Sequence, residues 1–355
     1  MTPYFTLLFT LAIATLFDGK KIDKVIFFAL TFFMFVFSAL RIGGTGPGDY
    51  EAYLRLYSLI DTFEKVINPE VHAEIGFRFL SFFGNYWGFS EQYIIIAMAI
   101  LALMPVVYVI YKYSPYKILS LIVWMPYFLT MNMHSSRTSV AAAFGLLFIS
   151  LYYNKKWLFS LLCLAVAVSF HSSALILLCI FLAKLGLKKI IWILFVALSI
   201  LIFVSPFDLL LIIFNTLGLT KFSDFLLVYL SSEDYGYPMK IYDPRIILGM
   251  ILCLIILKYQ KYILQNYDIY FFKIYILGIL MMVTFSSVMI MAWRVSYFLL
   301  LVSVLVIPWL AKLLNNIVEK NIGSKRVASF IFTLIYCLYT IPIILQAEPY
   351  EFFLD

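Results

Sequence analysis

"QYIIIAMAILALMPVVYVIY", residues 92–111, contains no charged side chain. A helix of about 20 such residues spans the roughly 30 Å hydrocarbon core of a bilayer. Only helices and closed barrels satisfy their backbone hydrogen bonds in lipid, and a continuous apolar run lacks the alternation of a barrel strand. This run therefore predicts a membrane-spanning α-helix.

Similar apolar runs recur along the chain. The clearest are Ile22–Leu40, Ile190–Val204, Tyr270–Ile290, Val295–Ala311 and Ala328–Leu345. Of the 355 residues, 64% are hydrophobic and 13% are charged, with a mean hydropathy of +1.00. Soluble domains carry roughly 25% charged residues, so we expect an all-α polytopic membrane protein, with residues 1–355 forming a single integral membrane domain. The first run, Met1–Phe17, lacks a basic n-region and a cleavage site, and we expect a retained span.

Lysine clusters predict the orientation of these spans. They lie at Lys20–Lys24, Lys112–Lys117, Lys155–Lys156, Lys184–Lys189, Lys258–Lys261 and Lys312–Lys325. Placing them in the cytoplasm satisfies the positive-inside rule. The N-terminus, the loops 41–91 and 207–243, and the C-terminal tail then lie outside. The required even number of crossings is met if residues 157–184 form a short helical hairpin that turns at His171. One long helix would invert everything downstream. We predict the hairpin, and about 12 crossing segments within a range of about 10 to 14.

Arginines and lysines separate in this topology. Every arginine except Arg326 lies on the outer side or at an outer helix end: Arg41, Arg55, Arg78, Arg137, Arg245 and Arg294. The planar guanidinium donates two parallel hydrogen bonds to phosphate and never deprotonates. The pattern therefore predicts an outer vestibule for a phosphate-bearing ligand, and the net charge of +7 reflects membrane orientation rather than nucleic-acid binding. The chain has no P-loop, no GxGxxG after a strand and no HExxH, which excludes an ATP-driven motor within it.

Two polar residues follow or interrupt apolar runs. Arg137 opens a helix after Ser135 and Ser136, where it either snorkels to the interface or adds its charge to an anion-binding helix N-terminus. His171 lies in the middle of the expected hairpin. It either hydrogen-bonds the neighbouring serines as a structural element or acts as general base on a sugar hydroxyl.

Two further segments carry charged candidates. Arg294 precedes Tyr297 by one turn, so the arginine either snorkels or grips a pyrophosphate while the tyrosine stacks on a sugar. The segment 70–89 predicts an amphipathic helix at the outer interface, with Phe77, Leu80 and Phe83 on one stripe. Within it, Glu74 and Arg78 are four residues apart and form either an exposed ion pair or the edge of a charged site.

Six short motifs occur in order along nearly the whole chain. They are RIGGTGPGDYEAY, EIGFRFL, SSRTSVAAAF, FHSSALI, WRVSYF and EPYEFF. Together they resemble the EpsG-type polysaccharide polymerases, which are related to the O-antigen polymerases of the Wzy class. Each motif is short and unspecific alone, and their order carries the resemblance.

The resemblance implies a fold and a reaction. The expected protein is a GT-C-like helical glycosyltransferase of the bacterial inner membrane, with its active site facing the periplasm. It would transfer a growing glycan from undecaprenyl pyrophosphate to the non-reducing end of another lipid-linked repeat unit. The expected partners are this lipid-linked oligosaccharide, the bilayer and a chain-length regulator, with no nucleic acid.

Roles for individual residues follow from this reaction. The leaving pyrophosphate gains negative charge in the transition state, so arginines aimed at it would accelerate the reaction. We expect this role for Arg137, Arg294, Arg41 and Arg78. The attacking hydroxyl needs a base, for which His171 is the first candidate and Asp49 and Glu74 are the alternatives. We expect Tyr50, Tyr53 and Tyr297 to contact sugars, and we expect neither a metal nor a cofactor.

Other functions remain open to the same composition. A flippase or transporter of lipid-linked oligosaccharide would often show broken helices at matched positions of two repeats, whereas we find one interrupted pair, around His171. A membrane sugar O-acyltransferase would need a histidine within reach of a cytosolic acyl donor. A non-catalytic scaffold would not explain Arg137, His171 and Arg294.

Overall fold

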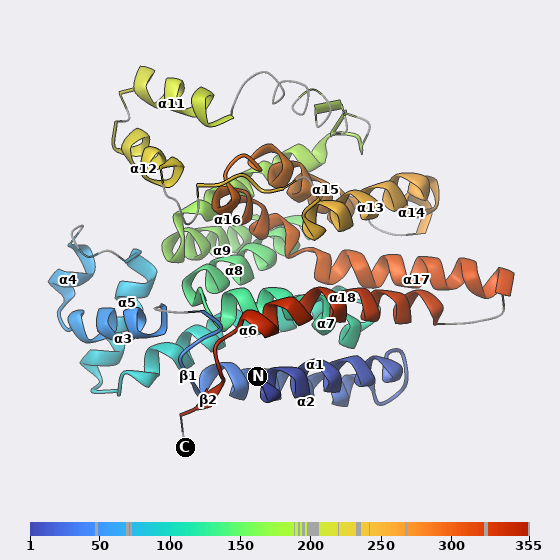
Figure 1. The fold of residues 1–355 in the computed structure, drawn as a ribbon, viewed down its shortest axis with the longest axis horizontal. Helices are drawn as coiled ribbons and strands as arrows, with labels where there is room; N and C mark the ends of the chain where they lie inside the picture. Colours follow the sequence, from blue (N-terminus) through green and yellow to red (C-terminus); the bar gives the residue numbers. More distant parts are fainter. Residues whose placement is uncertain are drawn as a thin grey trace. The chain divides into compact units, whose positions relative to one another are not determined.

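The structure is a computed structural model. It describes all residues except 47–48, 69–70, 72, 188, 191, 194–195, 197–205, 219, 232–235, 241, 267–268, 323–325 and 354–355. The described chain is almost wholly helical, as predicted (Figure 1). It divides into two compact units. Unit 1 comprises residues 1–175 and 301–355, and unit 2 comprises residues 176–300. Most of the expected span Ile190–Val204 lies outside the described residues.

Unit 1 contains most of the helices and a two-stranded antiparallel sheet. Its elements are α1 (Thr2–Ala14), η1 (Thr15–Phe17), α2 (Asp23–Ala39), β1 (Arg41–Ile42), α3 (Asp49–Leu59), α4 (Phe63–Ile67), α5 (Ile75–Tyr86), α6 (Gln92–Tyr113), α7 (Lys117–Tyr127), the π-helix η2 (Phe128–Asn132), α8 (Ser136–Tyr153), α9 (Trp157–Phe170), α17 (Ser303–Ile322), α18 (Val327–Gln346) and β2 (Glu351–Phe352). In the sheet, Arg41 pairs with Phe352 and Ile42 with Glu351.

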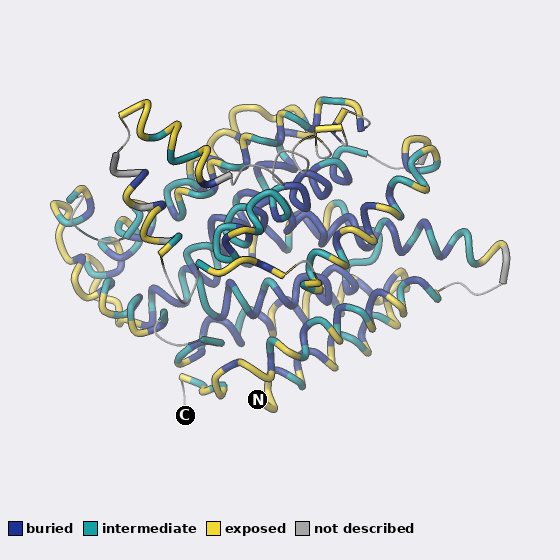
Figure 2. The backbone as a smooth tube through the Cα atoms, turned by 45° about the horizontal axis from the view of Figure 1, so that its top comes forward, coloured by how far each residue is buried: buried dark blue, intermediate teal, exposed yellow. Residues whose placement is uncertain are grey.

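Helix α7 lies at the centre of unit 1. Every residue from Ile118 to Pro126 is buried, and the helix packs against α1, α17 and α18. A helix that is apolar on all sides is stable only where it is covered on all sides. By contrast, α2 and α18 expose large apolar side chains along one face, among them Phe32 and Phe330, so buried and exposed residues alternate along these helices (Figure 2). Outward-facing apolar stripes of this kind suit a lipid environment.

Among the residues that the structure describes, two helices are long and apolar enough to cross a membrane, namely Gln92–Tyr113 and Val327–Gln346. They confirm two of the predicted apolar helices, at residues 92–111 and 328–345. A third span results if the bent pair Met289–Leu300 and Ser303–Lys320 is counted as one. Several other apolar helices are shorter: Thr2–Phe17, Trp157–Phe170, Ser172–Lys184, Phe207–Thr216 and Ile269–Thr284. The total of about 12 crossings stays a prediction.

The expected span Val295–Ala311 is not one continuous helix, and its crossing of the membrane stays a prediction. The structure ends α16 at Leu300 and starts α17 at Ser303, so two helices meet inside this run. Neither proline nor glycine lies at the break, and hydropathy alone gave no sign of it. Pro308 lies further on, inside α17.

The lysine-rich connections of unit 1 meet at one end, which we call the lysine end. There the carboxylate of Asp18 accepts hydrogen bonds from the backbone N–H groups of Ile118 and Leu119, over 2.9 and 2.7 Å. Arg326 donates to the carbonyls of Leu16 and Asp18, over 2.6 and 2.7 Å. These bonds join the turn before α2 to the starts of α7 and α18, in agreement with the shared side that the lysine pattern predicts for these connections.

The opposite ends of α2 and α18 carry the sheet, and we call this the arginine end, defined by Arg41, Tyr350 and the residues around them. The 17 residues of α2 separate the two ends, a rise of about 25 Å. At the arginine end, the ring of Tyr350 stacks on Phe37 with centroids 4.2 Å apart, and Tyr4 packs edge-on against both rings. The N-terminus, loop 41–91 and the C-terminal tail therefore share one end, as predicted.

Unit 2 has helices alone among its described elements. These are most of the 3₁₀-helix η3 (Ser172–Lys184), which starts in unit 1, then α11 (Pro206–Thr216), α12 (Thr220–Leu230), α13 (Pro244–Lys258), α14 (Gln260–Asn266), α15 (Ile269–Thr284) and α16 (Met289–Leu300). Within it, α15 packs against α13 and α16. Gly249 allows the first contact, because a Cβ atom there would lie 2.3 Å from the side chain of Ile279.

Candidate functional site

Arg41 is buried at the arginine end, with 1% of its surface exposed. Its guanidinium donates to the carbonyls of Gly43 and Asn132 and, over 2.9 Å, to the hydroxyl of Ser136. Burial lowers the pKa of Arg41, and neighbouring tyrosines oppose this shift. Its partners are carbonyl and hydroxyl oxygens, so the residue binds the protein's own backbone. The expected contact of Arg41 with pyrophosphate would require this network to open.

A π-helix supplies the carbonyls that hold the loop after β1. Pro126 cannot donate a backbone hydrogen bond, and η2 follows it directly. Thr45 donates its N–H to Met133 over 3.0 Å and its hydroxyl to Leu129 over 2.7 Å. Gly44 permits this approach, because a Cβ atom there would lie 2.6 Å from the Met133 carbonyl oxygen. The loop that leads to Asp49 is thus fixed on the N-terminal side of α8.

Helix α3 packs through three tyrosines at helical spacing, Tyr50, Tyr53 and Tyr57, all of which are buried. Tyr50 donates to the amide oxygen of Gln92 over 2.8 Å, and Gln92 donates in turn to the carbonyls of Ala39 and Arg41. Tyr57 donates to the carbonyl of Phe89 over 2.8 Å. Tyr50 and Tyr53 were expected to contact sugars, but their rings lie inside the protein.

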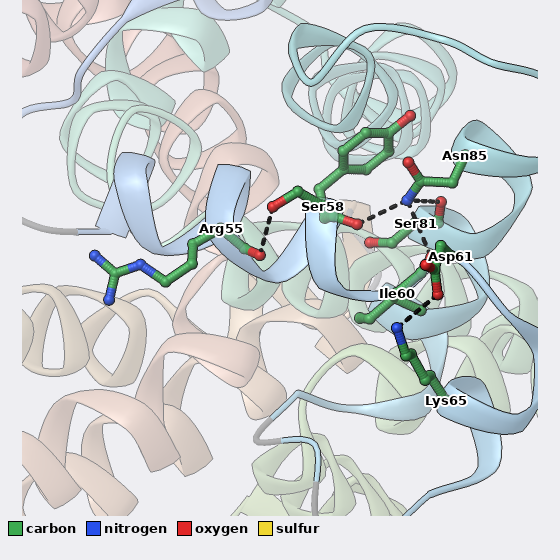
Figure 3. Close-up of polar contacts among 8 residues, drawn as sticks. Arg55, Ser58, Ile60, Asp61, Lys65, Ser81 and Asn85 are labelled. Carbon is green, nitrogen blue, oxygen red and sulfur yellow. Dashed lines mark hydrogen bonds and ion pairs between the residues drawn. The ribbon is translucent and has the colours of Figure 1, made fainter.

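Asn85 on α5 holds the other end of α3 (Figure 3). Its amide donates to the carbonyls of Tyr57, Ile60 and Ser81, at 2.7, 3.0 and 3.2 Å. The carbonyl of Tyr57 lies in the last turn of α3 and that of Ile60 directly after the helix, where carbonyls lack the N–H groups of a following turn. One side chain therefore fixes α3 against α5, while Arg55 points away from this cluster in Figure 3.

Arg137 and Glu74 form an ion pair that joins α8 to α5. Arg137 Nη1 lies 2.5 Å from Glu74 Oε2, and each side chain has 27% of its surface exposed. The guanidinium lies over the rings of Tyr53 and Phe77, with its carbon 5.6 and 5.8 Å from their centroids. The pair is therefore fixed from one side and open to solvent from another. Of the two readings of Glu74 and Arg78, a local ion pair or the edge of a charged site, the structure shows Glu74 paired instead with Arg137, across 63 residues of sequence.

Tyr53 lies beneath the pair as a neutral hydroxyl. The pKa of Tyr53 is raised to about 12, first by burial and then by the charge of Asp49, although Arg137 opposes this through its charge and through hydrogen bonds from its backbone and side chain. At neutral pH this hydroxyl keeps its proton. Tyr53 therefore positions Arg137 and is not a base.

Asp49 begins α3 and faces His134. His134 Nε2 lies 3.9 Å from Asp49 Oδ2, and the two side chains are 32% and 40% exposed. That distance is too long for a hydrogen bond. The imidazole packs against Gly46, where a Cβ atom would lie 2.9 Å from the ring. His134 and Asp49 thus form a second pair of a basic and an acidic side chain near Arg137. The negative charge of Asp49 also acts on the Arg137 guanidinium.

His171 lies between α9 and η3 with an extended backbone, φ −159° and ψ 116°. Its Nδ1 accepts the backbone N–H of Ser173 over 3.3 Å, so the side chain caps η3. A neutral imidazole has one acceptor nitrogen, and here that nitrogen is occupied. The break at His171 agrees with the predicted interruption, and the hairpin topology stays a prediction. Nearby, Gly76 at the start of α5 contacts the end of α9, because a Cβ atom there would lie 2.6 Å from Ser169 Oγ.

Helix α5 exposes most of its aromatic residues. Phe77, Ser81 and Gly84 face the protein, whereas Phe79, Phe83, Tyr86 and the C-cap residue Trp87 are exposed. Phe77 and Phe83 therefore do not share one stripe, because the helix packs through Phe77 and two small residues and turns its other large side chains outward. Arg78 donates to the carbonyl of Asn68.

Unit 2 carries its own charged cluster. Asp243 accepts the backbone N–H of Arg245 at the start of α13 and pairs with its guanidinium at 2.5 Å. The Arg245 guanidinium carbon lies 4.1 Å from the ring centroid of Trp293, which stacks on Tyr297 at 6.2 Å. The partnership of Arg245 was not predicted from the sequence, although the spacing of Asp243 and Arg245 around a proline could have suggested it. Arg294 lies on α16 in the same unit.

Metal ligands do not gather in the part of the chain that the structure describes. No three His, Cys, Asp or Glu side chains come together there in a group that could hold a metal ion. The ionisable groups form pairs instead, of which Arg137–Glu74 and His134–Asp49 lie at the arginine end.

Fold and site together define a helical membrane protein with a half-exposed arginine–carboxylate site at one end of unit 1. The model of a family described as the EpsG family matches residues 24–354, nearly the whole chain, and the chain therefore belongs to the EpsG family. This is a family of Wzy-like polysaccharide polymerases, so the protein is a polysaccharide polymerase with a glycosyltransferase-like activity. Neither the curated proteins nor the solved structures contain a significant match.

Proposed function

We propose that this protein polymerises lipid-linked repeat units at the outer face of the bacterial inner membrane. The glycan on one undecaprenyl pyrophosphate is transferred to the non-reducing end of another lipid-linked unit, and undecaprenyl pyrophosphate leaves. Membership of the EpsG family supports polymerisation in general. The lipid donor, the GT-C-like arrangement, the roughly 12 crossings and a chain-length regulator as partner are parts of the proposal.

The observation that carries the proposal is the position of Arg137. It is a half-exposed guanidinium at the end of unit 1 opposite the lysine connections, held over Tyr53 and Phe77. A pyrophosphate leaving group gains negative charge as the glycosidic bond breaks. A preorganised cation at that position stabilises the transition state more than the ground state. Arg78, at the next turn of α5 after Glu74, is the second arginine we assign to the lipid phosphates.

The acceptor hydroxyl requires a general base, and the carboxylates of Glu74 and Asp49 suit this role better than His171. The Nδ1 atom of His171 already accepts the N–H of Ser173. Glu74 and Asp49 are exposed enough to reach a sugar, with 27% and 40% of their side chains accessible. Direct attack on the anomeric carbon opposite the departing pyrophosphate inverts its configuration and needs no covalent enzyme intermediate. We propose this inverting, metal-independent course.

Other expected site residues support the site from behind. Arg41, Tyr50 and Tyr53 are buried. Arg41 bonds Ser136, Tyr50 bonds Gln92, and Tyr53 lies beneath Arg137, so we propose that all three hold the site in position. Arg294 and Tyr297 in unit 2 keep the proposed roles of phosphate and sugar contact.

A reconstituted assay tests the proposal. The full-length protein in liposomes, given purified lipid-linked repeat unit without ATP and with chelator, is expected to yield a ladder of lengthened glycans. Arg137→Ala should lower the rate about 100- to 1,000-fold. Arg55→Ala, which removes an exposed arginine from α3, should leave the rate unchanged. Translocation of the repeat unit without lengthening would instead identify a flippase.

A further inference from the structure

The side chain of Glu74 leaves its own helix to reach Arg137. Glu74 occupies the N-cap position of α5, yet its carboxylate makes no hydrogen bond to the first turn of that helix. A side chain at the N-cap position stabilises its helix when it accepts a hydrogen bond from a backbone N–H group of the first turn. Here the carboxylate instead lies 2.5 Å from Arg137 Nη1. The ion pair with Arg137 thus replaces the local contact that the position would otherwise make.

A phosphate and Glu74 compete for the same guanidinium. The exposed fractions of both side chains are 27%, so an anion from solvent can reach the pair. A phosphate bound to Arg137 beside the intact pair would lie close to the Glu74 carboxylate. Like charges this close to each other repel strongly near a protein surface. Pyrophosphate, with its greater charge, would therefore displace the carboxylate from Arg137.

The backbone around Glu74 is fixed, so the exchange is a movement of the side chain. Gly76 packs against Ser169 and Phe170, because a Cβ atom at Gly76 would lie 2.6 and 2.9 Å from these residues. Phe77, one residue further, is fully buried beneath Arg137. When Arg137 is taken by a phosphate, the carboxylate is free to rotate about its own side-chain bonds while Gly76 and Phe77 keep the start of α5 in place.

We propose that Glu74 occupies the phosphate position on Arg137 in the empty enzyme, and that pyrophosphate binding releases it to act as general base. This inference rests on the proposed function. In the reaction, the released carboxylate takes the proton of the acceptor hydroxyl as the hydroxyl oxygen bonds to the anomeric carbon. The bond from that carbon to the phosphate oxygen breaks, and its electron pair leaves with the pyrophosphate, which Arg137 holds. The base is thus free only when the donor is bound.

The exchange is tested by binding of inorganic pyrophosphate to the full-length protein in nanodiscs, measured by calorimetry. Glu74→Gln removes the competing charge and should tighten binding about tenfold, a change of about 1.4 kcal/mol. Glu64→Gln removes an exposed charge from the same loop and is the matched control. Equal affinities in the two variants, or weaker binding to Glu74→Gln, would overturn the exchange.

The proposed role of Glu74 as general base is tested by a separate measurement. Glu74→Gln should bind pyrophosphate more tightly and yet extend glycans at least about 100-fold more slowly, a combination that simple loss of a structural ion pair does not give. If Glu74→Gln does not fold, Glu74→Asp keeps the charge on a shorter side chain and should tighten binding to a smaller degree. Polymerisation by the wild type with unaltered affinity in both variants would refute the exchange alone. Failure of the wild type to polymerise would refute the proposed function. Failure of every variant to bind pyrophosphate, with polymerisation by the wild type intact, would refute the exchange alone.

Discussion

Arg41 and Ser136, which are 95 residues apart in the sequence, are joined by a 2.9 Å hydrogen bond inside unit 1. The same guanidinium bonds the carbonyl of Asn132 at the end of the π-helix. Ser136 is the first residue of α8, and Arg137 follows it directly. The buried Arg41 therefore fixes the start of α8, the helix that presents the partly exposed Arg137. The two arginines have the same side chain and different roles.

Replacing Arg41 by lysine should destabilise the protein despite keeping the charge. A lysine ammonium cannot reproduce the planar fork that bonds Gly43, Asn132 and Ser136 together. We expect a loss of roughly 2 to 4 kcal/mol, typical of an incompletely bonded buried charge. Thermal unfolding in detergent, followed by tryptophan fluorescence, measures the effect. Arg55→Lys is the control, and an equal melting temperature for the two variants would contradict the structural role of Arg41.

The C-terminal strand should be needed for activity although it lies outside the site. Tyr350 stacks on Phe37 and donates to its carbonyl over 3.0 Å, and β2 pairs with the strand that carries Arg41. Tyr350→Ala removes both contacts and should lower the rate of glycan extension about tenfold. Tyr350→Phe keeps the stack, worth about 1 kcal/mol, and should retain most activity. Full activity of Tyr350→Ala would show that β1 keeps its position without the contacts of Tyr350.

Asp18 at the lysine end should make stability depend on pH. Burial raises the pKa of Asp18 from 3.8 to about 7, and bonds from Ile118 and Leu119 only partly oppose this. The folded state therefore favours the protonated acid. Its stabilising contribution is complete below about pH 4 and is lost as the pH rises through about 7, a change on the order of 4 kcal/mol.

Asp18→Asn should flatten this pH profile between pH 4 and 7. Chemical denaturation at several pH values measures the slope of the free energy of unfolding. Asp61→Asn serves as the matched control, because Asp61 is exposed and its bond with Lys65 lowers its pKa. An unchanged slope in Asp18→Asn would show that another group titrates.

The sequence predicted those features that depend on local composition. Apolar runs located α6 and α18, and the lysine pattern placed the turn at Asp18 and the start of α18 at one end. It could not reveal the break between α16 and α17, because the residues there are as apolar as their neighbours. Whether an apolar run is one helix or two depends on what packs against it.

The candidate site was only partly predictable for a similar reason. Arg137 and Glu74 were both recognised as charges beside apolar runs, but α-helical spacing favoured Arg78 as the partner of Glu74. The tertiary contact with Arg137 prevailed because α5 turns Phe77 towards α8. Burial of Arg41, Tyr50 and Tyr53 was invisible too, since polar side chains in a glycine-rich loop resemble a binding surface whether they face solvent or the protein interior.

Substituting His171 by asparagine should separate its structural role from a catalytic one. The asparagine carbonyl can accept the N–H of Ser173 as Nδ1 does in the structure, and so can cap η3, but it cannot take a proton from a sugar hydroxyl. We expect His171→Asn to extend glycans within about threefold of the wild-type rate and to keep its melting temperature. His171→Ala should lose roughly 1 kcal/mol of stability, as uncapped helices do. A loss of at least about 100-fold in rate for His171→Asn, with stability preserved, would identify His171 as the base and would leave Glu74 only its part in the ion pair.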